Sequence, residues 1–202
     1  MNTEQQQCLL GALGYYALRR QDGTLAIDGK VGEATRAAIF RFQKDHEQRP
    51  DGSRLQTDGI WGRETEQAIR QVIGTDEDMA PGTYRWVDPE AFRCRCAGKY
   101  CGGWPARPSE KILGLLEQIG EHFRKPIQAH SGCRCLRWNE AVGGSPGSRH
   151  LTGSAMDFHL EGVSHQALYD YAESLLGDSG GLGLYDWGIH LDDREQKGRW
   201  RG

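Results

Sequence analysis

The sequence lacks any long hydrophobic segment. Its uninterrupted apolar stretches are only a few residues long, whereas a membrane-spanning helix needs about 20. The first ten residues, MNTEQQQCLL, have neither the basic start nor the continuous apolar core of a secretory signal. We therefore expect no membrane insertion and no export by the usual route, so that the protein is made in the cytoplasm.

The sequence also lacks an excess of basic residues. Its 202 residues carry a formal net charge of −3, and Lys and Arg are scattered among Asp and Glu. This distribution argues against nucleic acid as a partner. Hydrophobic residues make up 37% of the chain and glycine contributes 28 residues, which is typical of a loop-rich globular protein. The length fits a small domain followed by a medium-sized one, and we expect a monomer.

The Cys-x-x-Cys spacing of common zinc knuckles is missing, although the chain has six cysteines. Cys8 stands alone, and the second half holds Cys94, Cys96, Cys101, Cys133 and Cys135. Within this half, Cys94 and Cys96 are separated by a single residue, and so are Cys133 and Cys135. This pattern favours structural disulfides over a second metal site, with free buried thiols as a third alternative.

Residues 1–76 contain an internal repeat. The segment DGKVGEATRAAI, which starts at Asp28, returns thirty positions later as DGIWGRETEQAI, which starts at Asp58, with six of twelve positions identical. Each copy is predicted to be a tight Asp-Gly turn followed by a helix. Apolar residues at helical spacing precede the first copy, at Leu9, Leu10, Leu13 and Tyr16. We predict a small all-α domain of three short helices.

The runs LLGALGYY, FRFQKDH and DGIWGRET resemble the peptidoglycan-binding module found beside many wall hydrolases, and the resemblance covers nearly all of residues 4–74. It implies a non-catalytic anchor on glycan or stem peptide, with a shallow groove edged by Tyr15, Asp58 and Trp61. The alternative for each of these three residues is plain packing.

A linker is predicted over residues 77–91, which show neither helical nor alternating periodicity and contain two prolines. We expect this segment to be exposed. Trp86 and Phe92 are predicted to attach its far end to the second domain.

The second domain is predicted to span residues 92–202. An amphipathic helix is expected near Ser109 to Phe123, and further elements are expected at Ile127 to Ser131 (strand), Ala155 to Leu160 (strand), Ser164 to Leu176 (helix) and Gly183 to Asp192 (strand or hairpin). This mixture indicates an α+β domain with a small antiparallel sheet.

Two segments of this domain, SRHLTGSAMDFHL and LYDWGIHLDD, combine histidines and carboxylates with apolar strand residues. Two imidazoles and one carboxylate make a zinc site with an open fourth position, as a catalytic metal needs. The pattern alone leaves the set open, because Asp157 and His159 point the same way on a strand and either could reach a metal.

The spacing of Ser148, His150, Gly153, Ala155 and Asp157, with SGCR before it and His190 after it, resembles the superfamily of zinc D-alanyl-D-alanine carboxypeptidases and L-alanyl-D-glutamate endopeptidases. The resemblance implies Zn²⁺ held by His150, Asp157 and His190. It further implies that Arg134 binds a substrate carboxylate or carbonyl, as a planar fork of donors suits, and that Ser148 assists the substrate or the oxyanion.

The chain departs from the family at one position. Many members have an acidic general base three residues before the last histidine, where this sequence has Trp187. The base is therefore left open between Asp186 and Asp192, with a preference for Asp186.

These observations predict a zinc-dependent peptidoglycan peptidase, anchored to the cell wall by its first module and acting as a phage or prophage endolysin. The alternative is a catalytically inactive wall-binding protein, which the missing carboxylate at Trp187 motivates. A zinc peptidase with a substrate other than the wall is a third hypothesis. The sequence leaves the identity of the bond that is cut undetermined.

Overall fold

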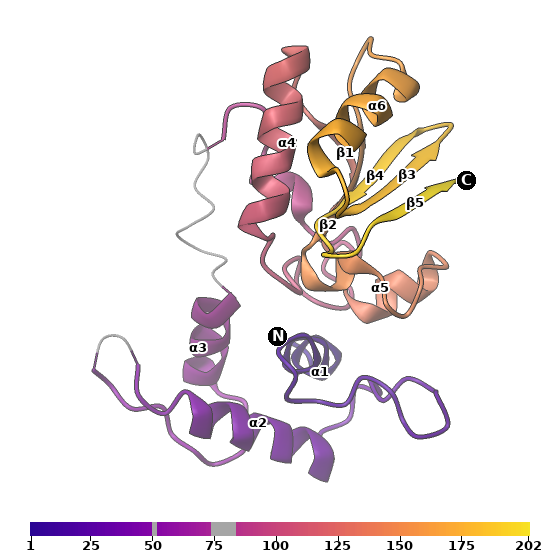
Figure 1. Cartoon of the computed structure of the whole chain (residues 1–202). Helices are drawn as coiled ribbons and strands as arrows, with labels where there is room; N and C mark the ends of the chain where they lie inside the picture. Colours follow the sequence, from indigo (N-terminus) through magenta and orange to yellow (C-terminus); the bar gives the residue numbers. More distant parts are fainter. Residues whose placement is uncertain (50–51, 74–83) are drawn as a thin grey trace.

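The chain folds into a helical region followed by an α+β region (Figure 1). The computed structural model describes residues 1–49, 52–73 and 84–202. None of the described helices is long and apolar enough to cross a membrane.

The first region contains the three predicted helices, α1 (Thr3–Ala12), α2 (Glu33–Asp45) and α3 (Arg63–Ile73). Its core consists of apolar side chains from all three helices, among them Leu10, Ile39, Phe42 and Ile69, which are at most 1% exposed. The expectation of a small helical domain is thereby confirmed.

A buried glutamine connects each of the first two helices to the turn of the repeat that follows it. The side-chain oxygen of Gln43 on α2 accepts hydrogen bonds from the backbone amides of Asp58 and Gly59, and its Nε2 donates to Asp58 Oδ1 and Thr65 Oγ1. Gln7 on α1 makes the equivalent bonds to Asp28, Gly29 and Thr35. The repeated unit is therefore larger than the sequence repeat, since it includes a glutamine on the preceding helix.

The second region is a five-stranded sheet with helices packed against it. Its α-helices are α4 (Glu110–Phe123), α5 (Leu136–Ala141) and α6 (His165–Leu176). It also contains two short 3-10 helices, η1 (Pro89–Phe92) and η2 (Arg149–Thr152). The strands are β1 (Gln128–Ser131), β2 (Ala155–His159), β3 (Gly181–Tyr185), β4 (Gly188–Asp192) and β5 (Gly198–Arg201). The main core lies where α4 and α6 meet the sheet and includes Ile112, Leu116, Phe158, Leu168 and Ile189.

The strand order is β1-β2-β4-β3-β5, and neighbouring strands are antiparallel except for β3 and β5, which are parallel. The α+β class is therefore confirmed, while the sheet is mostly rather than wholly antiparallel. The segment Gly183 to Asp192 was predicted as a strand or a hairpin. It is a hairpin, formed by β3 and β4, and β3 begins at Gly181. β5 was not predicted, because four residues reading GRWR carry no clear alternation.

Part of the predicted linker packs on the second region. The carboxylate of Glu117 on α4 accepts hydrogen bonds from the backbone amides of Arg85, Trp86 and Val87. Val87 is 2% exposed and Phe92 is fully buried, so the expected attachment of this end is confirmed and residues 84–91 do not form an exposed connection. Residues 77–83 of the predicted linker lie outside the described residues.

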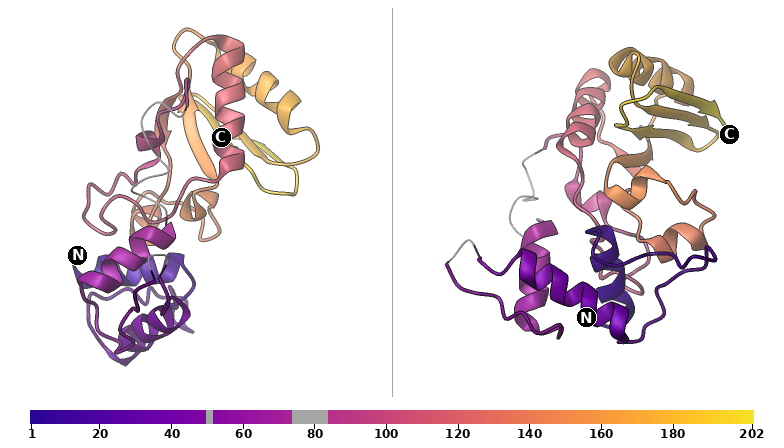
Figure 2. Two further views of the ribbon diagram at one scale, coloured as in Figure 1. Left: turned by 90° about the vertical axis from the view of Figure 1, so that its left-hand side faces the viewer. Right: turned by 60° about the horizontal axis from the view of Figure 1, so that its bottom comes forward.

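The two regions contact each other along α1 and α5 (Figures 1 and 2). Gln5 Nε2 donates to the carbonyl of Gly98 at 2.6 Å, and Arg137 on α5 forms a 2.8 Å ion pair with Glu4 on α1. The apolar side chains of α1 share one cluster with four cysteines of the second region. The predicted disulfides are not formed, since all six cysteines are free.

Candidate metal centre and cleft

Three buried side chains converge in the second region. Asp157 Oδ1 lies 3.2 Å from His150 Nε2 and 2.7 Å from His190 Nδ1. All three potential ligand atoms lie within 4.8 Å of one another. The structure thus brings together the three residues predicted to bind zinc.

The local structure explains this convergence. Asp157 on β2 and His190 on β4 are direct partners in the antiparallel register, so their side chains stand on the same face of adjacent strands. His150 comes from η2, which ends at Gly153 with a positive φ of 72°. A Cβ at Gly153 would lie 2.0 Å from the carbonyl oxygen of Arg107. Glycine therefore allows the tight turn that connects His150 to the strand carrying Asp157.

Each imidazole is fixed by a bond from its other nitrogen. His150 Nδ1 donates to the carbonyl oxygen of Gly132 at 2.6 Å, and His190 Nε2 donates to Asp192 Oδ2 at 3.0 Å. Carbonyl and carboxylate partners of this kind orient metal-binding histidines. The nitrogens that remain, Nε2 of His150 and Nδ1 of His190, are those that face Asp157.

Burial and charge set the protonation of the three groups. Burial lowers the pKa of His150. Burial opposes ionisation of Asp157, but its contacts with the two histidines outweigh it and hold the pKa of this carboxyl below its ordinary value. Burial also opposes protonation of His190, yet its hydrogen bonds to Asp157 and Asp192 outweigh it and raise the pKa of His190.

A cation fits this arrangement. When His150 is neutral and its Nδ1 carries the proton for Gly132, the lone pair of Nε2 faces the carboxylate of Asp157 at 3.2 Å. Two electron-rich atoms in such contact repel each other unless a positive charge lies between them. Two imidazole nitrogens and one carboxylate oxygen are also a donor set that Zn²⁺ accepts.

The three residues line a cleft of about 440 Å³. One side is aromatic: Tyr185 and Trp187 are stacked with ring centroids 4.6 Å apart, and Trp200 Nε1 donates to the Tyr185 hydroxyl at 2.7 Å. The ring of Trp200 also lies 5.2 Å from that of His190. These aromatic residues, and Arg194 on the cleft lining, were not identified from the sequence as parts of one site, because they are close only in the folded chain.

Arg134 and Ser148, predicted to assist the substrate, both line the cleft. Arg134 Nη2 contacts Asp157 Oδ2 at 2.5 Å and its Nε donates to Ser131 Oγ at 2.7 Å. Ser148 precedes η2 and lies two residues before His150. His159, the alternative ligand, instead contacts His130 at 2.9 Å and is not part of the group around Asp157.

Neither carboxylate predicted as a general base lies among the residues that line the cleft. Asp186 is exposed in the turn between β3 and β4 and lines a neighbouring cavity beside His165. Asp192 is fully buried, and its oxygens are engaged by His190, Arg194 and the amide of Gly181. Asp192 therefore lies behind His190, on the side of the ring away from Asp157.

The three residues predicted to edge a groove on the first region do not share one. Asp58 lines a shallow groove of about 460 Å³ with Val31 and Phe40. Tyr15 instead bonds His46 and packs edge-on against Phe42, and Trp61 Nε1 bonds Glu66. Exposed apolar side chains at the groove, 50% for Val31 and 44% for Phe40, were not identified from the sequence.

A buried His, Asp and His beside a polar and aromatic cleft define a site of the metallohydrolase kind. Comparison with protein families agrees with this class. Residues 87–192 match the family described as Peptidase M15, and residues 2–69 match the family described as "Putative peptidoglycan binding domain". The chain belongs to the peptidase M15 family and carries a domain of the second family before it.

Curated relatives are found among wall enzymes. The chain is 33% identical over 139 residues to the zinc D-Ala-D-Ala carboxypeptidase of Streptomyces albus G, an alignment that covers 66% of this chain and 49% of that protein. It is 34% identical over 89 residues to the peptidoglycan L,D-endopeptidase MepK of Escherichia coli K12, covering 41% of this chain and 45% of MepK. The chain thus spans about half the length of these relatives.

Proposed function

We propose that the protein is a zinc-dependent peptidoglycan peptidase that cuts a bond in the stem peptide or its cross-link. The observation that carries this proposal is the convergence of His150, Asp157 and His190 along one cleft. Membership of the peptidase M15 family and the names of the two wall-enzyme relatives support it.

His150 Nε2, Asp157 Oδ1 and His190 Nδ1 would hold the zinc ion. The chemistry that zinc supplies when bound is Lewis acidity toward the carbonyl of the bond that is cut. The chain supplies the rest of the site. Gly132 and Asp192 fix the two imidazoles, and this leaves their remaining nitrogens aimed at one point.

Substrate binding would involve the cationic and aromatic sides of the cleft. Arg134 has its Nη1 group beyond the bonds to Asp157 and Ser131, and a planar guanidinium suits a peptide carboxylate or carbonyl. The stacked rings of Tyr185 and Trp187 offer an apolar surface on the other side. Trp187 is 41% exposed, so its ring is accessible to a ligand.

The alternative function is a wall-binding protein without peptidase activity. It is favoured by one observation, that Asp157 is the only carboxylate among the described residues that line the cleft. An active peptidase would instead need a base from elsewhere, such as Asp186 after a rearrangement of the turn between β3 and β4. Turbidity of purified sacculi separates the two functions, since only a peptidase lowers it.

The test is the variant His150→Ala, compared with His122→Ala. His122 is an exposed histidine on α4 that stacks on Tyr171, away from the cleft. His150→Ala is expected to abolish turbidity loss and zinc binding at this site while sacculus binding persists, and His122→Ala is expected to retain all three. Full activity of His150→Ala would overturn the assignment.

Anchoring to the wall is the proposed role of the first region. Its match to a peptidoglycan-binding family and the exposed apolar groove at Val31 and Phe40 support this role. The pairing of an anchor with a peptidase also supports the finer proposal of an endolysin. Mass spectrometry of the muropeptides released from sacculi would identify the bond that is cut.

A further inference from the structure

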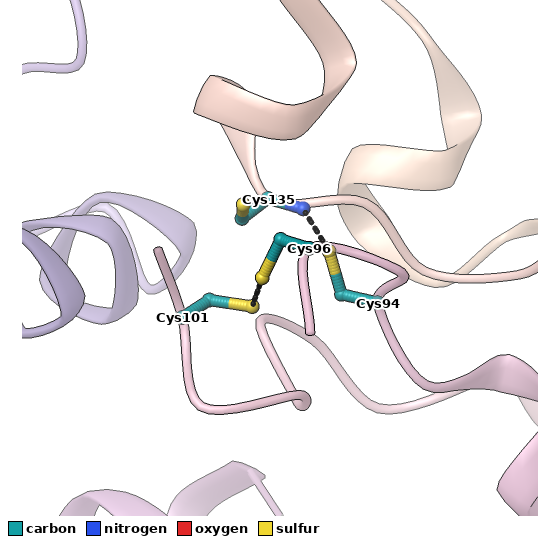
Figure 3. A group of neighbouring side chains, drawn as sticks. All are labelled: Cys94, Cys96, Cys101 and Cys135. Atoms are coloured by element: carbon teal, nitrogen blue, oxygen red, sulfur yellow. Dashed lines mark hydrogen bonds between the residues drawn. The ribbon is translucent and has the colours of Figure 1, made fainter. Parts of the chain in front are cut away.

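A second cluster of metal-binding side chains lies outside the cleft. Cys94, Cys96, Cys101 and Cys135 are all buried, and their four sulfur atoms lie within 4.8 Å of one another (Figure 3). Three come from the loop before α4, and the fourth immediately precedes α5. Nothing in the proposed peptidase chemistry uses these thiols.

The loop from Cys94 to Gly103 folds back on itself to present its three sulfurs. Cys94 N donates to the carbonyl of Gly103 at 2.7 Å, which closes the loop, and Lys99 N donates to the carbonyl of Cys96 at 2.9 Å, which forms a turn inside it. Ala97 has a φ of 52°, a left-handed conformation that costs free energy for a residue with a Cβ. Such strain is typical of loops whose conformation is imposed by a bound group or a site.

The sulfur positions fit a tetrahedral ion. A zinc ion with Zn–S bonds of about 2.3 Å separates its four sulfurs by roughly 3.8 Å, from the geometry of a regular tetrahedron. Cys96 Sγ and Cys101 Sγ are 3.5 Å apart, and every pair lies within 4.8 Å. Disulfides would instead draw the sulfurs together in pairs at about 2.05 Å.

The surroundings of the cluster also suit a thiolate site. The backbone amide of Cys135 donates to Cys94 Sγ at 3.3 Å, which stabilises a negative sulfur. The cluster packs against apolar side chains, among them Leu9, Tyr100, Leu136 and Trp138, which limit the access of water. Buried charge of this kind is stable when it is neutralised by a metal ion.

We propose that Cys94, Cys96, Cys101 and Cys135 bind a structural Zn²⁺ ion. Four sulfur ligands leave no position for substrate, as in structural rather than catalytic zinc sites. Cys133 is not a ligand, because its Sγ donates to the carbonyl of Ala106. Cys8 on α1 packs beside Cys135 as part of the surrounding shell.

The position of this site gives it two structural roles. Cys135 directly follows Arg134, whose side chain contacts Asp157 in the cleft. The same loop contacts α1 of the first region through Gln5 and Gly98. An ion here fixes the backbone that carries Arg134 and connects the loop, α5 and α1.

The experiment measures zinc in the full chain and four variants by mass spectrometry of metals. The wild type is expected to contain two zinc ions per chain, His150→Ala one, Cys96→Ala one, and the double variant none. Cys133→Ala is the matched control, a buried cysteine outside the cluster, and is expected to retain two. One ion in the wild type that His150→Ala removes would overturn the proposal, as would iron at the cysteine site.

A second measurement does not depend on the folding of a cysteine variant. The His150→Ala protein, stripped of zinc under reducing conditions and loaded with Co²⁺, is expected to show the near-ultraviolet charge-transfer absorption of cobalt thiolates and the visible bands of tetrahedral cobalt. Absence of both bands would overturn the proposal. Intact-mass analysis of the untreated protein that shows disulfides among these four residues would overturn it equally.

Discussion

At the scale of single residues, the position of Asp192 changes its expected role. It is fully buried and bonds His190 Nε2, the nitrogen opposite the one that faces Asp157. We infer that Asp192 acts through His190 as a positioning residue rather than as a base. Its location was predictable only in part: alternation along a strand places it on the face of His190, but it does not reveal that Arg194 and Gly181 occupy its oxygens.

Replacement of Asp192 tests this positioning role. Asp192→Asn is expected to weaken zinc binding at the peptidase site by about 10- to 100-fold, the usual effect of removing a carboxylate behind a histidine ligand. Competition with a chromophoric chelator measures this affinity. Asp186→Asn is the control and should leave the affinity unchanged. Loss of activity in Asp192→Asn with unaltered affinity would contradict a positioning role.

Zinc affinity of the peptidase site should also depend on pH. Because two carboxylates raise the pKa of His190, the metal-free site retains its proton above the ordinary histidine range near about 6.5. Zinc must displace that proton, so affinity rises with pH until the raised pKa is passed. The folding stability of the metal-free protein depends on pH in the opposite direction. Protonated His190 stabilises the folded state at low pH, and this stabilisation is lost as pH rises through the folded-state pKa of His190.

Calorimetry in buffers of different ionisation enthalpy measures the protons released when zinc binds. The expected result is proton release that decreases as pH increases through the raised pKa of His190. Affinity that is constant from acid to neutral pH would contradict this prediction.

At the scale of elements, the sequence predicted most helices and strands because their signals are local. Ser109 and Ser164 cap α4 and α6 as polar residues before an amphipathic stretch should. The cysteine loop gave no comparable signal, because a Cys-x-Cys pair and a distant Cys135 meet only through tertiary folding. The convergence of His150, Asp157 and His190 was predicted through family resemblance, since the pattern alone also allowed His159.

The glutamine between α2 and the second repeat turn is an element-scale feature that mutation can test. Gln43 is 1% exposed, and Gln43→Ala would leave the amides of Asp58 and Gly59 without their acceptor. We expect a loss of about 2–3 kcal/mol of stability in the first region, as for buried polar groups left unpaired. Denaturant unfolding followed by circular dichroism measures it. Gln71→Ala, at an exposed position on α3, should change stability by less than about 0.5 kcal/mol.

At the scale of the whole molecule, the proposed anchoring role makes a specific prediction, because binding of the first region to the wall would turn the encounter of the cleft with its substrate into an intramolecular event. If the groove beside Asp58 holds the wall, Phe40→Ala should reduce binding to sacculi and their hydrolysis together, while cleavage of a small soluble muropeptide stays unchanged. Val72→Ala is the matched control, because Val72 is similarly exposed at 43% but lies on α3 away from the groove. Equal loss on soluble and insoluble substrates would argue against an anchoring groove.

The peptide bond between Arg134 and Cys135 has a practical consequence for anyone who prepares this protein. This bond joins Arg134, whose guanidinium lies in the cleft, to Cys135, whose thiol lies in the buried cluster. Air oxidation of the Cys135 thiol is therefore expected to shift the Arg134 guanidinium as well. Refolding in an oxidised glutathione buffer, or purification over a nickel column without reductant, would then yield protein that looks folded yet binds substrate poorly.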